Sequence, residues 1–268
     1  MDDWRSGVAR EAATAGGDVA LELFRADLDV ETKDGKTDVV TQADVEAQRR
    51  VAAVIREHDP DAVVVGEEGD APTSIPATGP AWVVDPIDGT HNYVAGIRRW
   101  ATSVAALTDG EPVAAANVLP ALDDTYVADS KGARRNGESI TVSERSDPDV
   151  CTVVPTIWWN HDRREEYATA TTEIVRRFGD LARFKSAQAT LSLLASGAVD
   201  GTFSTLEPHP WDTVAGVYLV RQAGGRVTDL SGERWTHDSV GLVASNGPIH
   251  DRVLAAAQAT ADAGGIEY

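Results

Sequence analysis

Two acidic residues three positions apart, Asp85 and Asp88, stand directly after an apolar run and are followed by Gly89 and Thr90. Such a run is typical of a buried strand, and Pro86 stiffens the chain so that both carboxylates can point at one spot. Buried acids held together either repel each other or share cations, and carboxylate oxygens suit Mg²⁺. The Gly-Thr pair offers backbone N–H groups and a hydroxyl to a phosphate. An acidic surface turn is the alternative, but it would need no apolar strand before it.

A further acid lies far downstream, where Trp211 and Asp212 open a predicted helix that ends at Ala223 before two glycines. Pro208 and Pro210 precede the helix and place Asp212 in its first turn. An acid there is stabilised by the helix dipole, so Asp212 could simply support the helix N-terminus. Because the chain also carries the first motif, the stronger interpretation of Asp212 is a carboxylate that binds a metal.

The elements that must position these acids begin with two helices, predicted over residues 4–28 and 44–57 from apolar residues at helical spacing. Strands follow, and Asp109-Gly110 between two of them is a typical hairpin turn. The predicted strands are 63–65, the strand ending at Asp85, 101–107, 113–119, 124–128 and 139–142. They predict a mainly antiparallel sheet.

Beyond about residue 146, short strands and helices alternate, which is typical of an α/β arrangement with a largely parallel sheet. The predicted strands are 152–154, 181–184, 199–203, 226–228 and 242–244, and the predicted helices are 163–178, 187–195, 211–223 and 249–261. We expect two sheet-bearing halves, an α+β half over 1–145 and an α/β half over 146–268. They should meet at a crevice in one compact catalytic unit.

The chain is strongly acidic: 43 acids against 24 bases give a formal charge of −19 over 268 residues. This charge argues against nucleic acid or an anionic membrane as a partner. Four of the bases are lysines, namely Lys33, Lys36, Lys131 and Lys185. An acid-rich, lysine-poor surface keeps a protein hydrated in concentrated salt, so we expect a halophilic source.

Cys151 is the sole cysteine, which excludes an internal disulfide and a cysteine metal cluster and favours a small buried side chain. No apolar run reaches the roughly 18 residues of a membrane helix. The first residues lack the basic-then-apolar layout of a secretory signal. A reducing cytoplasm fits these features, so we expect a cytoplasmic protein.

Both acidic motifs, with two further ones, resemble the inositol monophosphatase family of Mg²⁺-dependent sugar-phosphate phosphatases. The matching motifs stand in the family's order along nearly the whole chain and are 82–93, 211–225, Gly66-Glu67-Glu68, and Lys33, Asp38, Val39, Val40 and Thr41 with Asp44. The resemblance implies an α/β fold of the sugar-phosphatase type, a layered α/β/α/β/α sandwich. Members are usually dimeric, so we expect a homodimer.

The resemblance also implies metal ligands. A first Mg²⁺ site would comprise Glu67, Asp85 and the backbone carbonyl of Ile87. A second would comprise Asp85, Asp88 and Asp212, with Asp85 bridging the two ions. A third, weaker Mg²⁺ would lie near Glu67 and bind mainly through waters.

The resemblance further implies that Gly89 and Thr90 receive phosphate oxygens. Thr41, Asp44 and Thr90 would hold the attacking water and help deprotonate it, and Glu67 counts among the catalytic residues through the metal it binds. This agrees with the chemistry, since two nearby cations can cancel the charge of a phosphate ester, activate a water and stabilise the leaving alkoxide. Positioning and charge neutralisation are the general requirements of phosphoryl transfer.

Other classes of protein fit less well. No serine, cysteine or histidine nucleophile stands in a suitable motif, and His91 and His209 are interpreted as wall residues because Mg²⁺ prefers oxygen ligands. A catalytically inactive relative kept for binding or assembly would be expected to lack a ligand carboxylate. The five acids of the motifs are all present, which argues against such a relative: Asp44, Glu67, Asp85, Asp88 and Asp212.

Substrate choice depends on positions where the chain departs from the family pattern. Inositol-specific members carry a glutamate seven residues before the second-motif aspartate, and Thr205 stands here, with Glu207 two residues on. Lys185 stands before Ser186 where many members have glycine. A cation there could bind the second phosphate of a bisphosphate sugar, although a surface lysine paired with an acid is equally expected. Lys185, Ser186 and Thr205 are therefore candidate substrate-binding residues.

Archaeal members similar to this chain often hydrolyse both myo-inositol 1-phosphate and fructose 1,6-bisphosphate. We expect these two sugar phosphates as substrates, the second of which belongs to gluconeogenesis and carbohydrate metabolism. A 3′-phosphoadenosine-5′-phosphate phosphatase with the same metal core is the alternative. Trp158, Trp159 and Asn160 could then form an adenine pocket, although a partly buried interface pair is the more ordinary interpretation.

Overall fold

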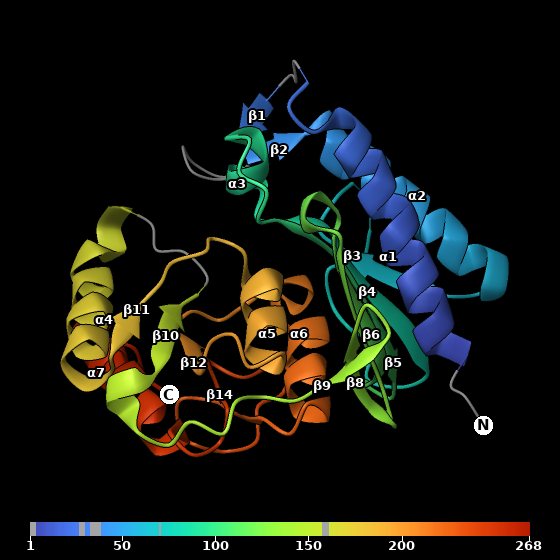
Figure 1. Cartoon of the computed structure of the whole chain (residues 1–268). Helices are drawn as coiled ribbons and strands as arrows, with labels where there is room; N and C mark the ends of the chain where they lie inside the picture. Colours follow the sequence, from blue (N-terminus) through green and yellow to red (C-terminus); the bar gives the residue numbers. More distant parts are fainter. Residues whose placement is uncertain (1–3, 27–29, 33–38, 70, 157–160) are drawn as a thin grey trace.

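Two β-sheets enclose a pair of helices, and a further pair of helices covers the outer face of each sheet (Figure 1). The computed structural model describes residues 4–26, 30–32, 39–69, 71–156 and 161–268, with 30–32 and 39–41 described by their backbone alone. The layers are thus helix, sheet, helix, sheet, helix, and the predicted α/β/α/β/α sandwich is confirmed.

The larger sheet has seven strands that follow one another in chain order. They are β3 (Val63–Gly66), β4 (Pro80–Asp88), β5 (Ala101–Thr108), β6 (Glu111–Leu119), β7 (Asp124–Asp129), β8 (Gly132–Arg135) and β9 (Glu138–Ile140). β3 and β4 are parallel, and each later pair is antiparallel. The predicted hairpin is confirmed, because Asp109 (φ 52°) and Gly110 (φ 76°) form the two-residue turn between β5 and β6.

Helices α1 (Trp4–Leu23) and α2 (Gln42–His58) cover the outer face of this sheet (Figure 1). The two helices pack so closely that a Cβ added to Gly16 of α1 would lie 2.4 Å from Cγ2 of Val51 of α2. A short antiparallel pair, β1 (Val30–Thr32) and β2 (Val39–Thr41), precedes α2.

The prediction that the first helix continues to residue 28 is wrong, since α1 ends at Leu23. Arg25 has a positive φ of 66°, which breaks the helical course of the backbone. Its guanidinium donates two hydrogen bonds, of 3.1 and 2.7 Å, to the carbonyl of Gly96 and so fixes the turn.

The smaller sheet has five strands in the order β11-β10-β12-β14-β13. They are β10 (Thr152–Pro155), β11 (Asp180–Leu181), β12 (Gly201–Ser204), β13 (Arg226–Thr228) and β14 (Leu242–Ser245). The prediction of a largely parallel sheet is only half right: β10 is parallel to β11 and β12, but β14 is antiparallel to β12 and β13. β14 follows β13 without an intervening helix, and parallel neighbours need such a crossover.

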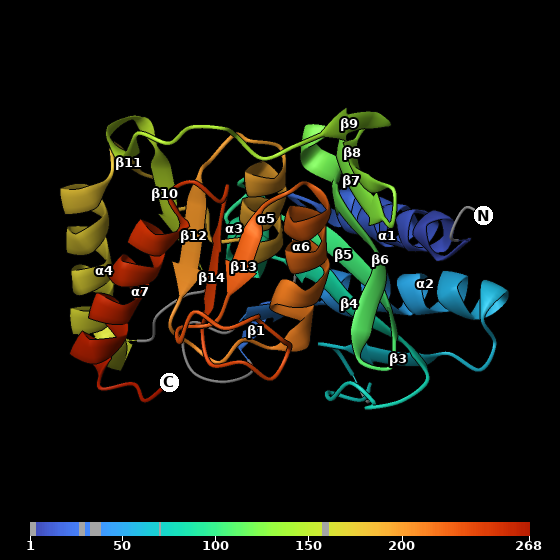
Figure 2. The same cartoon turned by 90° about the horizontal axis from the view of Figure 1, so that it is seen from below.

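Four helices pack on the smaller sheet, two on each face (Figure 2). They are α4 (Arg164–Arg177) and α7 (His250–Gly264) on the outside, and α5 (Ala187–Ala195) and α6 (Pro210–Gln222) between the two sheets. α6 is buried on nearly every side, as expected of a helix in the central layer. Among the described residues, no helix combines the length and apolar character needed to cross a bilayer.

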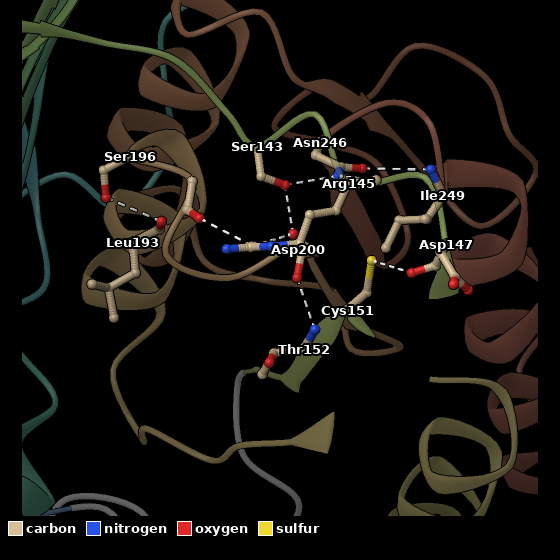
Figure 3. A network of polar contacts seen from close by, with 11 residues as sticks. Ser143, Arg145, Asp147, Cys151, Thr152, Leu193, Ser196, Asp200, Asn246 and Ile249 are labelled. Carbon is tan, nitrogen blue, oxygen red and sulfur yellow. Dashed lines mark hydrogen bonds and ion pairs between the residues drawn. The ribbon is translucent and has the colours of Figure 1, made fainter. Parts of the chain in front are cut away.

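A buried aspartate anchors the segment that joins the two sheets (Figure 3). Asp200, 1% exposed, accepts hydrogen bonds from the Ser143 hydroxyl, from Arg145 Nη1 (2.7 Å) and from the Thr152 backbone N–H (2.8 Å). Asn246 Nδ2 donates to the Ser143 hydroxyl and to the Arg145 carbonyl. The predicted boundary at residues 145 and 146 falls in this segment, and the division into two halves stays a prediction.

His250 is a buried histidine at the start of α7. It is 0% exposed, and its two ring nitrogens lie 2.9 Å from the Ser245 hydroxyl and 3.0 Å from the Thr228 hydroxyl. Burial, and secondarily the charge of Arg226, lowers the pKa of His250 from 6.5 to about 4. The folded protein therefore keeps this ring neutral at pH values where the unfolded chain protonates it.

We predict that His250 makes the fold sensitive to mild acid. Because the folded pKa of about 4 lies below the unfolded value of 6.5, the stabilisation is present above pH 6.5 and is lost as pH falls toward 4. One pKa unit corresponds to ~1.4 kcal/mol, so the loss amounts to at most about 3 kcal/mol in the free energy of unfolding. Denaturant unfolding from pH 4 to 7 should show a smaller pH dependence in His250→Gln than in the wild type. An equal pH dependence in both proteins would contradict this assignment.

Candidate metal centre

A β-bulge in β4 turns Asp85 and Asp88 to one side of the sheet. The two residues are three apart on β4 but pair with residues two apart on β5. Residues three apart on a regular strand point to opposite faces, and one extra residue reverses that alternation. The Thr102 hydroxyl donates to the Pro86 carbonyl at 2.8 Å and holds the bulge in place.

Asp88 is held by the first turn of α5. Its Oδ1 accepts from the backbone N–H of Ala187 (3.0 Å), and its Oδ2 accepts from that of Gln188 (2.8 Å) and from the Ser186 hydroxyl. The N–H groups at a helix start have no partner within the helix and stabilise a negative charge. Burial raises the pKa of Asp88, and these hydrogen bonds oppose that rise.

Asp212 reaches the centre from the first turn of α6, beside the stacked rings of His209 and Trp211 (centroids 4.8 Å apart, planes at 9°). The side chain of Gln188 donates to the carbonyl of Trp211 at 2.6 Å, one residue before Asp212. Gln188 thus contacts both parts of the site: its backbone binds Asp88, and its side chain binds the start of α6.

The carboxylates of Asp85, Asp88 and Asp212 meet, with one oxygen of each within 4.8 Å of the others. Oδ1 of Asp85 is buried and has no hydrogen-bond partner within the described part of the chain. Burial raises the pKa of Asp85 well above its usual value, and the charges of Glu67, Asp88, Asp212 and Asp44 raise it further. An unpaired buried carboxylate oxygen among other acids is costly unless a cation shares it. These residues therefore fit a metal ion that takes oxygen ligands.

Glu67 follows β3 and lies outside the three-carboxylate group, yet it exerts the largest charge effect on the pKa of Asp85. The next residue is held by Gln48 of α2, whose Oε1 accepts from the Glu68 N–H at 2.9 Å and whose amide donates to the Glu68 carbonyl. A Cβ on Gly66 would lie 2.7 Å from Gln48 Oε1. The Gly-Glu-Glu motif therefore needs its glycine so that Gln48 can orient the acidic segment.

Asp44 and Thr90 lie together at the edge of the centre. Asp44 is 1% exposed, and the Thr90 hydroxyl lies 3.4 Å from its Oδ1 and 3.1 Å from the Ile87 carbonyl oxygen. The Ile87 carbonyl was predicted as a metal ligand and here accepts this hydroxyl, which leaves it a second lone pair. The predicted water-binding pair Asp44 and Thr90 is thus brought together, while its catalytic role stays a prediction.

Gly89 and Lys185 contact each other through their backbones. Gly89 has a φ of 93°, and a Cβ there would lie 3.0 Å from the Lys185 carbonyl oxygen. Lys185 itself has a φ of 56°, a conformation that favours glycine, and its side chain is exposed. Asn92 joins the two segments by donating to the carbonyls of Phe184 (2.7 Å) and Arg99 (2.6 Å).

Thr205 is 1% exposed, and its hydroxyl donates to a carboxylate oxygen of Glu166 in α4. Glu166 is 2% exposed and accepts two hydrogen bonds from Arg163, of 2.6 and 2.8 Å. The chain therefore places an acid beside position 205 from another helix. Substrate recognition by Thr205 stays a prediction, and Glu207 is exposed.

Part of the predicted site lies outside the described residues. This applies to Lys33 and Asp38 of the fourth motif and to the possible adenine wall, Trp158, Trp159 and Asn160. Thr41 ends β2 immediately before α2, but its side chain lies outside the described part as well.

The sequence-based interpretation missed several residues that hold the centre in place. Gln188 is a polar residue in an apolar helix, and that contrast was an available signal. Asn92 lay inside the first motif, although nothing in the motif indicated its partners. Gln48 and Glu166 carried no signal, because their contacts join segments 20 and 39 residues apart.

Comparisons with known proteins agree on one family. The model of the inositol monophosphatase family matches residues 4–262. A Thermotoga maritima protein named fructose-1,6-bisphosphatase/inositol-1-monophosphatase is 35% identical over 230 residues, 84% of each chain. A Mycobacterium tuberculosis histidinol-phosphatase is 35% identical over 260 residues, 90% of this chain and 95% of the other. The structure of a Thermotoga maritima IMPase superposes with a TM-score of 0.86 at 30% identity, covering 98% of this chain and 99% of that one.

We predict that cation binding to this centre strengthens as pH rises. Asp85 has a raised pKa, so a proton competes with the cation until the pH exceeds that pKa. Thermal unfolding at increasing Mg²⁺ should show a half-saturating concentration that falls from pH 5.5 to pH 8. Asp85→Asn should lose the response, while Asp251→Asn, at an 88% exposed side chain, should keep it. A response that survives in Asp85→Asn would place the cation elsewhere.

Proposed function

The chain belongs to the inositol monophosphatase family, and we propose that it hydrolyses phosphate monoesters of inositol and sugars at the centre formed by Asp85, Asp88 and Asp212. It is a metal-dependent phosphoric monoester hydrolase. The observation that carries the proposal is the buried Asp85 oxygen, which has no hydrogen-bond partner among the described residues, within the cluster of three carboxylates. Gly89 and Thr90 follow this cluster directly in the sequence.

The proposed metal is Mg²⁺, with two ions at the ligands Glu67, Asp85, Asp88, Asp212 and the Ile87 carbonyl, and a third near Glu67. Bound ions of this kind neutralise phosphate charge and lower the pKa of an attacking water. The number of acids whose charges act on Asp85 supports more than one ion. A single divalent cation would leave most of this negative charge uncompensated.

Residues around the acids are assigned to phosphate binding and to the attacking water. Gly89 adopts a positive φ that lets the backbone turn sharply after Asp88, and we assign its N–H and Thr90 to the phosphate oxygens. The Thr90 hydroxyl lies 3.4 Å from Asp44 Oδ1, so this pair can hold a water whose proton Asp44 accepts. Thr41, which precedes α2, is assigned to the same water.

The proposed substrates are myo-inositol 1-phosphate and fructose 1,6-bisphosphate, which would place the enzyme in gluconeogenesis or related carbohydrate metabolism. The name of the Thermotoga maritima relative supports both. L-histidinol phosphate belongs in the same substrate panel because of the Mycobacterium tuberculosis relative. Neither of these two relatives is named for the nucleotide alternative, 3′-phosphoadenosine-5′-phosphate.

Three further assignments, of oligomeric state, location and source, rest on composition and on what is usual in the family. We propose a homodimer, as is usual in the family. The single cysteine supports a cytoplasmic location. The charge of −19 with four lysines supports a halophilic source, and assays should therefore include a series of KCl concentrations.

We predict that Asp212→Asn removes most of the Mg²⁺-dependent phosphate release while the protein stays folded. The loss should exceed about 100-fold in kcat, since changes to residues that merely support metal ligands already cost about 10–100-fold. Asp88→Asn should lose as much activity but also stability, because an amide cannot accept all the hydrogen bonds that Asp88 receives from α5. Asp251→Asn is the charge-matched control and should match the wild type. Near wild-type turnover of Asp212→Asn at saturating Mg²⁺ would make the assignment wrong.

We predict that Lys185 selects for a second phosphate. Its exposed ammonium has no ion-pair partner among the described residues, and its backbone contacts Gly89. Lys185→Ala should lower kcat/KM for fructose 1,6-bisphosphate about tenfold, the typical effect of losing one charged hydrogen bond, and leave myo-inositol 1-phosphate nearly unchanged. Lys185→Gly removes the same charge and suits the positive φ, so it separates charge from backbone strain. Equal losses on both substrates, or none on either, would contradict the role.

A further inference from the structure

A second cavity lies apart from the carboxylate centre, along the side of α6. It has a volume of about 190 Å³ and is lined by the hairpin turn 109–112, by Val214 and Arg221 of α6, and by the loop 235–238. One water needs roughly 10–15 Å³ of such space, so a small molecule fits. None of the proposed metal ligands lines the cavity, which is built from the larger sheet and from the half that carries Asp212.

Arg221 lines this cavity and is the charged side chain on which its binding properties depend. Its Nη2 donates to the Trp235 carbonyl at 2.6 Å, and it forms no ion pair within the described part of the chain. Burial lowers the pKa of Arg221, the nearby charge of Arg234 lowers it further, and the charge of Glu111 partly opposes this shift. A guanidinium partly removed from water without an opposite charge is costly, and a bound anion offsets that cost.

The acids around the cavity are already engaged. Glu111 accepts two hydrogen bonds from Arg234, of 3.0 and 2.7 Å. Asp109 Oδ1 accepts a hydrogen bond from the Gly79 N–H at 2.8 Å and keeps its charge. Asp238, whose side chain is 86% exposed, lies 3.0 Å from His237, and this pair is ionic only when His237 is protonated. The charge of Glu111 also acts on Arg221, but both carboxylate oxygens of Glu111 are bound by Arg234, and Arg221 forms no ion pair among the described residues.

The remaining walls suit a compact ligand with a small apolar part. Trp235 is 2% exposed, and its indole N–H donates to the Gly241 carbonyl, so its ring is fixed. Val214 and Pro112 supply aliphatic surface. A planar guanidinium binds the two oxygens of a carboxylate or phosphate in parallel, which a lysine cannot do.

We propose that this cavity is a second anion-binding site, in which Arg221 binds a small oxyanion, either phosphate or a short carboxylate. The site is independent of the proposed catalytic function. Because its walls come from the β5–β6 hairpin and from α6, a bound anion joins the larger sheet to the helix that begins beside Asp212. Occupancy therefore stabilises the packing of α6 against that sheet.

The test uses metal-free enzyme in EDTA, where the acidic catalytic centre does not attract anions. Potassium phosphate, and separately potassium propionate, is added at constant ionic strength maintained with KCl, and the midpoint of thermal unfolding is measured. We expect a saturable rise of about 2–5 °C with at least one of the two anions. Phosphate alone would indicate a phosphate ester as the natural ligand, and propionate alone would indicate a carboxylate.

Two substitutions with opposite expected effects make the test specific. Arg221→Gln should abolish the rise in the unfolding midpoint. Glu111→Gln removes the carboxylate whose charge competes with the anion for Arg221, so it should lower the half-saturating anion concentration. Arg226→Gln removes the same charge at an exposed site and should leave the rise unchanged. If Arg221→Gln fails to fold, Arg221→Lys should weaken binding while Glu111→Gln still strengthens it. A rise that does not saturate, or that is equal in wild type and Arg221→Gln, overturns the proposal.

Discussion

The repulsion among acids around Asp85 is the constraint on which the rest of the structure depends. Asp85 is 1% exposed, and the charges of four further acids act on it. Two like charges 4 Å apart repel by about 4 kcal/mol even at an effective dielectric constant of 20. Such a cluster does not hold itself together, so each acid must be held by the element that carries it. The same repulsion makes the site receptive to cations, because a bound cation removes the cost.

Three different devices hold the acids in place. The bulge in β4 turns Asp85 and Asp88 to one side, and the start of α5 supplies hydrogen-bond donors to Asp88. Gln188 then connects α5 to the carbonyl before Asp212. The site therefore needs both sheets in a fixed relation, and the buried Asp200 contributes by anchoring the segment that connects them. The relative positions of the acids therefore depend on how the two sheets pack together.

The features that sequence analysis predicted well are those determined by short stretches of chain. The Asp-Gly hairpin and the apolar strand that leads into Asp85 were predicted because turn chemistry and hydrophobicity are local. The predicted end of that strand at Asp85 is wrong, because β4 continues through a bulge to Asp88. The position of β14 between β12 and β13 was not, since strand order depends on distant pairings. For the same reason, the partners of Asp88 in α5 and the contact between Glu166 and Thr205 could not be predicted.

The two departures from the family pattern, at Lys185 and Thr205, do not fall on the acids of the metal centre. Lys185 adopts a left-handed φ of 56°, which costs a residue other than glycine roughly 1–2 kcal/mol. Glu166 brings a buried acid to Thr205 from α4. Replacing one of the acids would remove a proposed metal ligand, whereas a change at Lys185 or Thr205 leaves the acids in place. We infer that this chain differs from its relatives in which ester it accepts, and not in how the phosphate is hydrolysed.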